Sequence, residues 1–229
     1  REQEIVTVKV QKVEPNGDLI VEIGKVTEIL PAAEQVPGES FSPGDLIKVY
    51  VVDIKGLDRR YPHATLSRAH PGLVKRLFEL EVPEVKEGLV EVKAVSREAG
   101  SRSKVAVWCK DPDVDPVGAC IGSRGSRIER IVDLLGGEKI DVIKYSEDVA
   151  EFVAAALAPA EVLHVRVVDN DEHICHITVP ENKLSLAIGN KGQNARLAAK
   201  LTTWKIDIKS DAQAAAPQMI VIDGYDDDD

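Results

Sequence analysis

The sequence is poor in aromatic residues and in cysteine, and it has no long hydrophobic run. Aromatic side chains make up 4% of the 229 residues, which disfavours RNA-recognition motifs, because their sheets stack bases on aromatic rings. Cys109, Cys120 and Cys175 are odd in number and widely spaced, so a disulfide framework is disfavoured. No apolar run is long enough to span a membrane, and no signal-peptide pattern opens the chain. These absences predict a cytoplasmic protein without membrane contact.

The charge of the chain is unevenly distributed. The formal net charge is −10 at pH 7, and residues 212–229 carry five acidic and no basic side chains. A nearly neutral body should bind duplex DNA poorly through non-specific electrostatics, although local cationic patches remain available for binding. We expect residues 212–229 to form an acidic tail with one apolar patch at Met219–Ile222. This tail either keeps the chain soluble or folds back on cationic loops elsewhere in the chain, where it would mimic a nucleic acid.

Residues 1–70 show the pattern of a small β-barrel. Apolar and polar residues alternate over 4–10, and a Pro-Asn-Gly-Asp turn separates them from a second strand at 19–23. Further strands are predicted at 26–30, 46–54 and 64–67. Five short strands in about 70 residues are typical of a barrel of the OB type. Candidate base-stacking residues in it, which could equally be core or loop residues, are Phe41, Tyr50, Tyr61 and His63.

The predicted elements after residue 70 occur twice in the same order. Each copy reads helix, strand, strand, short helix, glycine loop, helix, strand. This is the layout of the prokaryotic, or type II, KH fold. The sequence therefore predicts an α+β multidomain protein. Its predicted parts are a five-stranded OB-type barrel at 1–70, a first KH domain at 71–146, a second KH domain at 147–211 and the tail at 212–229.

A GxxG loop lies between two helices in each copy, at 122–125 and again at 189–192. One such motif is expected by chance in a chain of this length, because glycine makes up about 7% of residues. The repeated order of elements is what gives the motif its weight. Glycine lets a polyanion approach main-chain N–H groups, and the next helix points its positive dipole end at the same place. We predict a non-catalytic clamp for single-stranded RNA.

The predicted RNA contacts belong to the loops and to the helix turns beside them. Main-chain N–H groups would hold phosphates, cations would add charge, amides would donate hydrogen bonds, and apolar residues would floor a groove for unstacked bases. For each cation, a merely solvated surface position is the alternative. The predicted set is the cations Arg124, Arg127, Lys191 and Arg196, the amides Gln193 and Asn194, the apolar residues Ile121 and Ile188, and the loop residues Gly122, Ser123, Gly125, Gly189, Asn190 and Gly192.

Longer segments of the chain resemble the bacterial NusA transcription factors. The segment 66–84, with the sequence LSRAHPGLVKRLFELEVPE, is similar to the junction that follows the S1 barrel in that family. The second loop and its helix, 187–201, are similar to the family's second KH domain. Other matching segments are 115–128, 135–143 and 158–162. The resemblance covers about residues 1–210.

The resemblance implies an S1–KH–KH body of an elongation factor that binds nascent single-stranded RNA. Such factors associate with RNA polymerase and influence pausing, termination and antitermination. The implied partners are RNA, RNA polymerase and other elongation or antitermination factors, and we expect a monomer without cofactor or metal. The chain begins at Arg1 and lacks the family's N-terminal polymerase-binding domain, so we expect a fragment whose polymerase contact depends mainly on that domain. The tail does not resemble the acidic repeats of some members.

Three other classes of protein remain open at this point. An S1–KH exoribonuclease would need large catalytic domains that this sequence does not supply. A metal site could be built from Asp111, Asp113 and Asp115, or from His164, His173, Cys175 and His176. Neither set has the spacing of an EF-hand or of a zinc finger. The third class is an S1–KH protein that binds ribosomal RNA.

Overall fold

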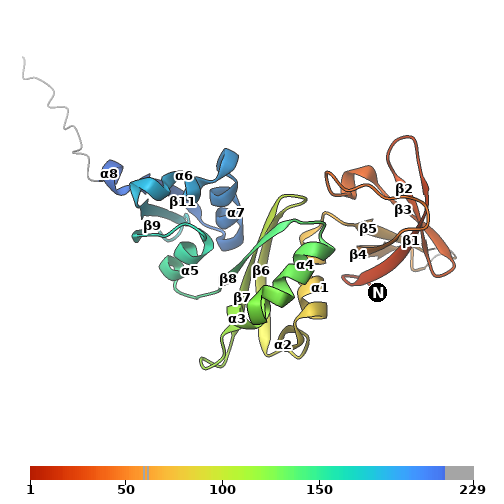
Figure 1. The fold of residues 1–229 in the computed structure, drawn as a ribbon, viewed down its shortest axis with the longest axis horizontal. Coiled ribbons are helices and arrows are strands. Elements are labelled where there is room, and N and C mark those ends of the chain that lie inside the picture. Colours follow the sequence, from red (N-terminus) through yellow and green to blue (C-terminus); the bar gives the residue numbers. More distant parts are fainter. Residues whose placement is uncertain (59, 61, 215–229) are drawn as a thin grey trace, which may run out of the picture.

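The computed structural model describes residues 1–58, 60 and 62–214. These residues form three parts in a row, a barrel followed by two α/β repeats, so the predicted α+β architecture is confirmed (Figure 1). The predicted tail lies outside the described residues from position 215 on, including its apolar patch and its aspartate run. None of the described helices is long and apolar enough to cross a membrane.

The barrel consists of five antiparallel strands in the order β3-β2-β1-β4-β5. All five strands predicted from the sequence are present. Alternate residues such as Val8 and Val10 point into the core, which is why the period of two was visible in the sequence. The N–H of Ala64 donates to the Glu28 carboxylate at 3.2 Å, and this contact draws β3 and β5 together. The strands are β1 (Ile5–Val13), β2 (Leu19–Ile23), β3 (Val26–Leu30), β4 (Leu46–Lys55) and β5 (His63–Ser67).

The first repeat contains a three-stranded sheet in the order β6-β7-β8, with β7 antiparallel to β6 and parallel to β8. Pro83 ends the first helix, as predicted, and also begins a short second one, because proline is well tolerated in a first turn. Asp115 caps the helix that leads to the GxxG loop by accepting from Gly118 N at 3.0 Å. The elements are α1 (Pro71–Glu81), α2 (Pro83–Lys86), β6 (Val90–Glu98), β7 (Arg102–Cys109), α3 (Pro116–Ile121), α4 (Ser126–Leu134) and β8 (Lys139–Lys144).

The second repeat has the same topology, with the strand order β11-β10-β9 and the same pattern of one antiparallel and one parallel pairing. The helix after the tandem repeats is a single turn at the start of the predicted tail. The elements are α5 (Val149–Ala156), β9 (His164–Asp169), β10 (Ile174–Val179), α6 (Leu184–Ile188), α7 (Gln193–Thr202), β11 (Lys205–Ser210) and α8 (Asp211–Ala214).

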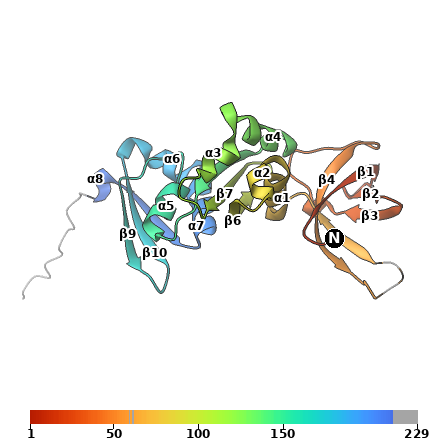
Figure 2. The same ribbon diagram turned by 90° about the horizontal axis from the view of Figure 1, so that it is seen from below.

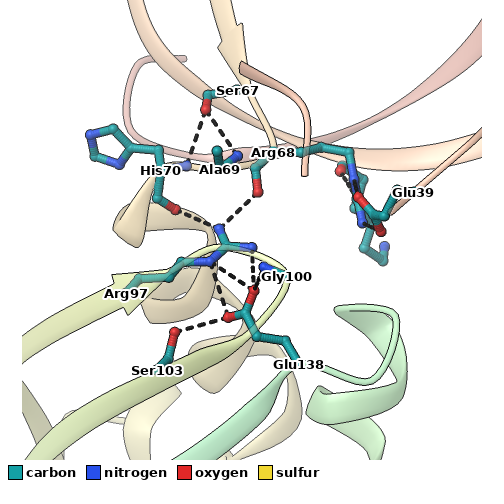
Figure 3. A network of polar contacts seen from close by, with 10 residues as sticks. Glu39, Ser67, Arg68, Ala69, His70, Arg97, Gly100, Ser103 and Glu138 are labelled. Carbon is teal, nitrogen blue, oxygen red and sulfur yellow. Dashed lines mark hydrogen bonds and ion pairs between the residues drawn. The ribbon is translucent and has the colours of Figure 1, made fainter. Parts of the chain in front are cut away.

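A buried ion pair joins the barrel to the first repeat (Figure 3). The Arg97 guanidinium lies 3.0 Å from the Glu138 carboxylate, and both side chains are fully buried. Arg97 also donates to the main-chain carbonyls of Arg68 and His70, which follow β5 and precede α1. Glu138 accepts further hydrogen bonds from Gly100 N and from the Ser103 hydroxyl. The buried Arg97 and Glu138 side chains therefore have hydrogen-bond partners on both sides, and they tie the chain segment that leaves the barrel to the first repeat.

The second repeat packs directly on the sheet of the first, with α7 beside β6 and β7 and α5 beside β8 (Figure 2). Ala106 and Ile143 of the first repeat share a hydrophobic core with these helices. The buried Lys104 ammonium donates to Asp141 at 2.9 Å and to the carbonyl of Ala158 at 2.7 Å. Burial lowers the pKa of Lys104, although Asp141 opposes this. This shared core crosses the predicted boundary at residue 146. The domain boundaries at 70, 146 and 211 stay predictions.

Candidate nucleic-acid interface

The two GxxG loops have the same backbone conformation. Gly122 and Gly189 adopt φ/ψ of 76°/172° and 81°/171°. Arg124 and Lys191 both lie in the left-handed region, at 55°/31° and 54°/29°. The last glycine of each loop has φ of 75°. The two loops therefore share one backbone conformation although the residues between their glycines differ.

The first glycine of each loop is required by a close approach as well as by its φ. A Cβ at Gly122 would lie 2.7 Å from Cγ of Arg127, and one at Gly189 would lie 2.7 Å from the main-chain nitrogen of Asn194. The last glycines have open space, because no atom lies within 3.5 Å of a Cβ at Gly125 or Gly192. They are required by positive φ alone.

Each loop presents main-chain donors at its tip. The Gly125 N–H is used within the loop by the carbonyl of Gly122, at 3.1 Å. Among the described residues, no acceptor faces the N–H groups of Ser123 and Arg124, and the same holds for Asn190 and Lys191. Two adjacent free N–H groups at a glycine-rich turn are suited to a phosphate oxygen.

The predicted cations fall into two groups. Arg124 and Lys191 are exposed, and within the described part of the chain neither has a carboxylate partner. Arg196 pairs with Glu98 of the first repeat at 2.6 Å and also donates to the Lys191 carbonyl. Its charge is therefore largely balanced, so the unpaired positive charge of the two loops lies on Arg124 and Lys191.

Arg127 and Asn194 stabilise the loops through hydrogen bonds to the short helix that precedes each loop. Arg127 pairs with Glu84 at 2.6 Å and donates to the Ala119 carbonyl at 2.8 Å. Asn194 is 3% exposed, and its amide donates to the carbonyls of Leu157 and Ala187. We expected Asn194 to donate to RNA, but in this structure both of its N–H groups are used inside the fold.

The remaining predicted residues lie at the surface beside the loops. Ile121 and Ile188 are each 36% exposed, at the end of the short helix that precedes each loop. Gln193 donates from the second loop to the hydroxyl of Ser101 in the first repeat, at 2.7 Å. The second loop is thus anchored to the β6–β7 turn.

A cleft of about 380 Å³ lies between the two repeats at the second loop. Residues of the first repeat line one side, and the second loop lines the other. Sequence reasoning missed this side because its residues lie far from the loop along the chain. Arg102 is paired with Asp141 at 2.7 Å, whereas Lys139 is exposed. The residues that line this cleft include Ser101, Arg102, Lys139, Leu186, Gly189 and Asn190.

The barrel candidates for base stacking differ in their exposure. Tyr50 is 7% exposed and stacks on His70 at 4.8 Å between ring centroids, so the hypothesis that it binds bases is wrong. Phe41 is half-buried beneath the Arg68 guanidinium. His63 is exposed and lies 3.8 Å from Glu28. Tyr61 lies outside the described residues.

The metal alternatives find no support in the geometry of the described residues, where no group of three or more His, Cys, Asp or Glu side chains could hold an ion. Asp115 caps α3, and Asp111 accepts from Asp113 N at 2.9 Å. His173 stacks on Trp204, with ring centroids 4.6 Å apart. Cys175 is buried on the inner face of its strand.

Two family profiles match the repeats. Residues 68–145 match the NusA-like first KH domain, and residues 149–216 match the NusA-like second KH domain. Together they cover more than half of the chain and confirm the two predicted KH folds.

Curated relatives with the name "Transcription termination/antitermination protein NusA" align with almost the whole chain. The Halalkalibacterium halodurans protein is 52% identical over 93% of this chain, and the Bacillus subtilis protein is 53% identical over 93%. The Mycobacterium tuberculosis protein is 49% identical over 95%. The chain spans 55%, 57% and 64% of the length of these three relatives. With its barrel and tandem KH domains in this order, the chain belongs to the NusA family.

Proposed function

We propose that this chain is the RNA-binding body of a factor that acts on transcription termination and antitermination, and that it binds nascent single-stranded RNA. The observation that carries the proposal is the pair of identical loops, each with two free N–H groups and one unpaired cation. Phosphates would bind at Ser123–Arg124 and at Asn190–Lys191, while Ile121 and Ile188 would contact bases. The proposed role is non-catalytic and uses no cofactor.

The geometry between the repeats favours one continuous strand across both loops. The cleft at the second loop is walled by the first repeat, and exposed Lys139 lies at its edge. Gln193 and Arg196 tie the second loop to Ser101 and Glu98. These contacts hold the second loop in a fixed position against the first repeat, and the proposal is that an RNA strand bound at the first loop continues to the second.

Charge reversal at the loop tips tests the clamp. Arg124→Asp with Lys191→Asp should weaken binding of a single-stranded RNA by about 100-fold in fluorescence anisotropy, since charged hydrogen bonds each contribute about 1.5–3 kcal/mol. Adding Ser123→Asp and Asn190→Asp should weaken it further. The matched control is Lys75→Asp with Lys86→Asp, which changes the charge equally on exposed positions of α1 and α2. Unchanged RNA affinity in a folded quadruple variant would falsify the mechanism.

The partners are proposed from the family. RNA polymerase and other elongation or antitermination factors would bind the complete protein, with the main polymerase contact outside residues 1–229. Purification of the full-length protein from its own cells should enrich RNA polymerase. Enrichment of ribosomal subunits in place of polymerase would instead favour a ribosomal S1–KH protein.

A further inference from the structure

The two repeats differ in what covers the outer face of their sheets. In the first repeat, Ala106 and Ile143 on this face are buried beneath α5 and α7 of the second repeat. In the second repeat the long helices cover the inner face, and none of the described elements covers the outer face (Figure 2). We call this surface the open face.

Strand alternation decides which side chains lie on the open face. Val165, Ile177 and Ile208 pack into the core on the inner side. Their neighbours along each strand therefore point outward. The polar and charged residues of the open face are His164, Arg166 and Asp169 on β9, His176 and Thr178 on β10, and Lys205, Asp207 and Lys209 on β11.

Contacts between the strands place these side chains on one surface. Nη2 of Arg166 lies 3.2 Å from Nδ1 of His176. On the other side, Nε2 of His176 lies 3.7 Å from the carboxylate of Asp207, and Nζ of Lys209 lies 3.9 Å from it. All of these side chains are at least partly exposed. The open face therefore carries a continuous polar row across three strands.

The open face is cationic although the chain as a whole is acidic. Arg166, Lys205 and Lys209 share this face with two carboxylates, Asp207 and Asp169, in a chain with net charge −10. The Asp169 carboxylate already accepts hydrogen bonds from the N–H groups of Asp171 and Glu172. The two imidazole rings lie among these cations. Cations that bind phosphates, with rings on which bases stack, are the combination that binds single-stranded nucleic acid.

The open face also adjoins the second GxxG loop. The edge strand β11 carries Lys205 and Lys209 outward and contacts α6, the short helix that leads into the loop. An RNA strand that passes over the sheet edge at β11 goes from the side of the second GxxG loop to the open face. We propose that the open face binds the part of a single-stranded RNA that extends beyond the two GxxG loops. This inference rests on the proposed function of the loops.

The experiment compares two RNA lengths on the full chain. An RNA of about eight nucleotides fills the two loops, at about four nucleotides each. Two longer RNAs of about 16 nucleotides contain the same segment, one with the extension at its 5′ end and the other with the extension at its 3′ end. Lys205→Gln with Lys209→Gln should leave affinity for the short RNA unchanged and lower affinity for one of the long RNAs about 10-fold. The slope of log affinity against log salt should fall by about 1.4, for two lost phosphate contacts. Arg166→Gln should add to the loss.

The control Lys75→Gln with Lys86→Gln removes two exposed charges elsewhere and should change neither affinity. Unchanged binding of both long RNAs by the Lys205 and Lys209 variant would overturn the open-face proposal while leaving the loops intact. Failure of the unchanged chain to bind the short RNA would overturn the loop function itself.

The acidic residues 223–229 are the competing occupant of the open face. Changing their five aspartates to asparagine should leave the affinity difference between long and short RNA unchanged. A rise in long-RNA affinity that requires Lys205 and Lys209 would show that the acidic segment competes with RNA for the open face. If the chain with asparagines binds long and short RNA equally well, the RNA proposal is wrong.

Discussion

Arg127 and Asn194 occupy equivalent positions behind the two GxxG loops, and each donates to a main-chain carbonyl of the short helix before its loop. The first does so with a charged side chain paired to Glu84, the second with a buried neutral amide. Two different side chains thus support the same loop conformation. This relationship separates residues that hold the loops from residues that can reach RNA.

Removal of the Asn194 amide should destabilise the fold. Asn194→Ala leaves the carbonyls of Leu157 and Ala187 buried without their donor, and we expect a loss of about 2–3 kcal/mol in the free energy of unfolding. Gln193→Ala, at the next and more exposed position, is the control and should cost less than about 1 kcal/mol. Urea unfolding followed by circular dichroism measures both. Equal losses in the two variants would contradict the supporting role of Asn194.

The two glycines of one loop should differ in their sensitivity to alanine. Gly192→Ala has room for its methyl group, so only the positive φ costs free energy, about 1–2 kcal/mol. Gly189→Ala adds a clash with the main-chain nitrogen of Asn194 and should cost at least about 1 kcal/mol more. Urea unfolding gives the difference, and anisotropy should show a larger loss of RNA affinity for Gly189→Ala. The reverse order would mean that the loop adjusts in a way the structure does not show.

The Arg97–Glu138 pair should be necessary for the junction between barrel and first repeat. Glu138→Gln leaves the Arg97 charge buried without a counter-charge, and such losses cost about 3–5 kcal/mol. Glu91→Gln is the control, because Glu91 forms an exposed pair with Lys93 and should change stability by less than about 1 kcal/mol. The free energies of unfolding in urea distinguish the two cases. A similar small effect for both substitutions would refute the role of the buried pair.

The three thiols should differ in reactivity. Burial, with a smaller contribution from Glu84, raises the pKa of Cys120 to about 12, and burial raises the pKa of Cys175 to about 11. Because the thiolate is the reactive form, iodoacetamide at pH 8 should modify half-exposed Cys109 first and the other two only on unfolding. Mass spectrometry locates the modified residues, and Cys109→Ser should abolish the fast reaction. Rapid modification of Cys120 in the folded chain would contradict its buried position.

These raised pKa values also predict a pH dependence of stability. In the unfolded chain the two thiols ionise near their ordinary pKa of about 8.5. Their contribution to stability is therefore complete below that pH and declines as the pH rises toward 11 and 12. Cys120→Ala should weaken this decline in urea unfolding between about pH 8 and 10. An unchanged pH profile would show that Cys120 ionises equally well in the folded state.

Local patterns determined most of the fold. Alternation over residues 4–10 predicted a strand because one side of β1 is buried, and the helix after each GxxG loop was predicted because its apolar residues recur at helical spacing. The positions of Gly122 and Gly189 were also predictable, since only glycine tolerates the backbone that the loop requires. The repeated order of elements, read from the chain alone, was enough to predict two KH domains.

Only the tertiary structure decided what each charged or polar residue does. Arg124 and Arg127 look alike in the sequence, but Glu84, 43 residues from Arg127, pairs with Arg127 and leaves Arg124 free. Lys139 lines the cleft at the second loop because the second repeat packs on the first. The second repeat makes this contact through its helices, so the outer face of its own sheet stays open. Partners of this kind are brought together by packing of segments distant in sequence, so local pattern carries no record of them.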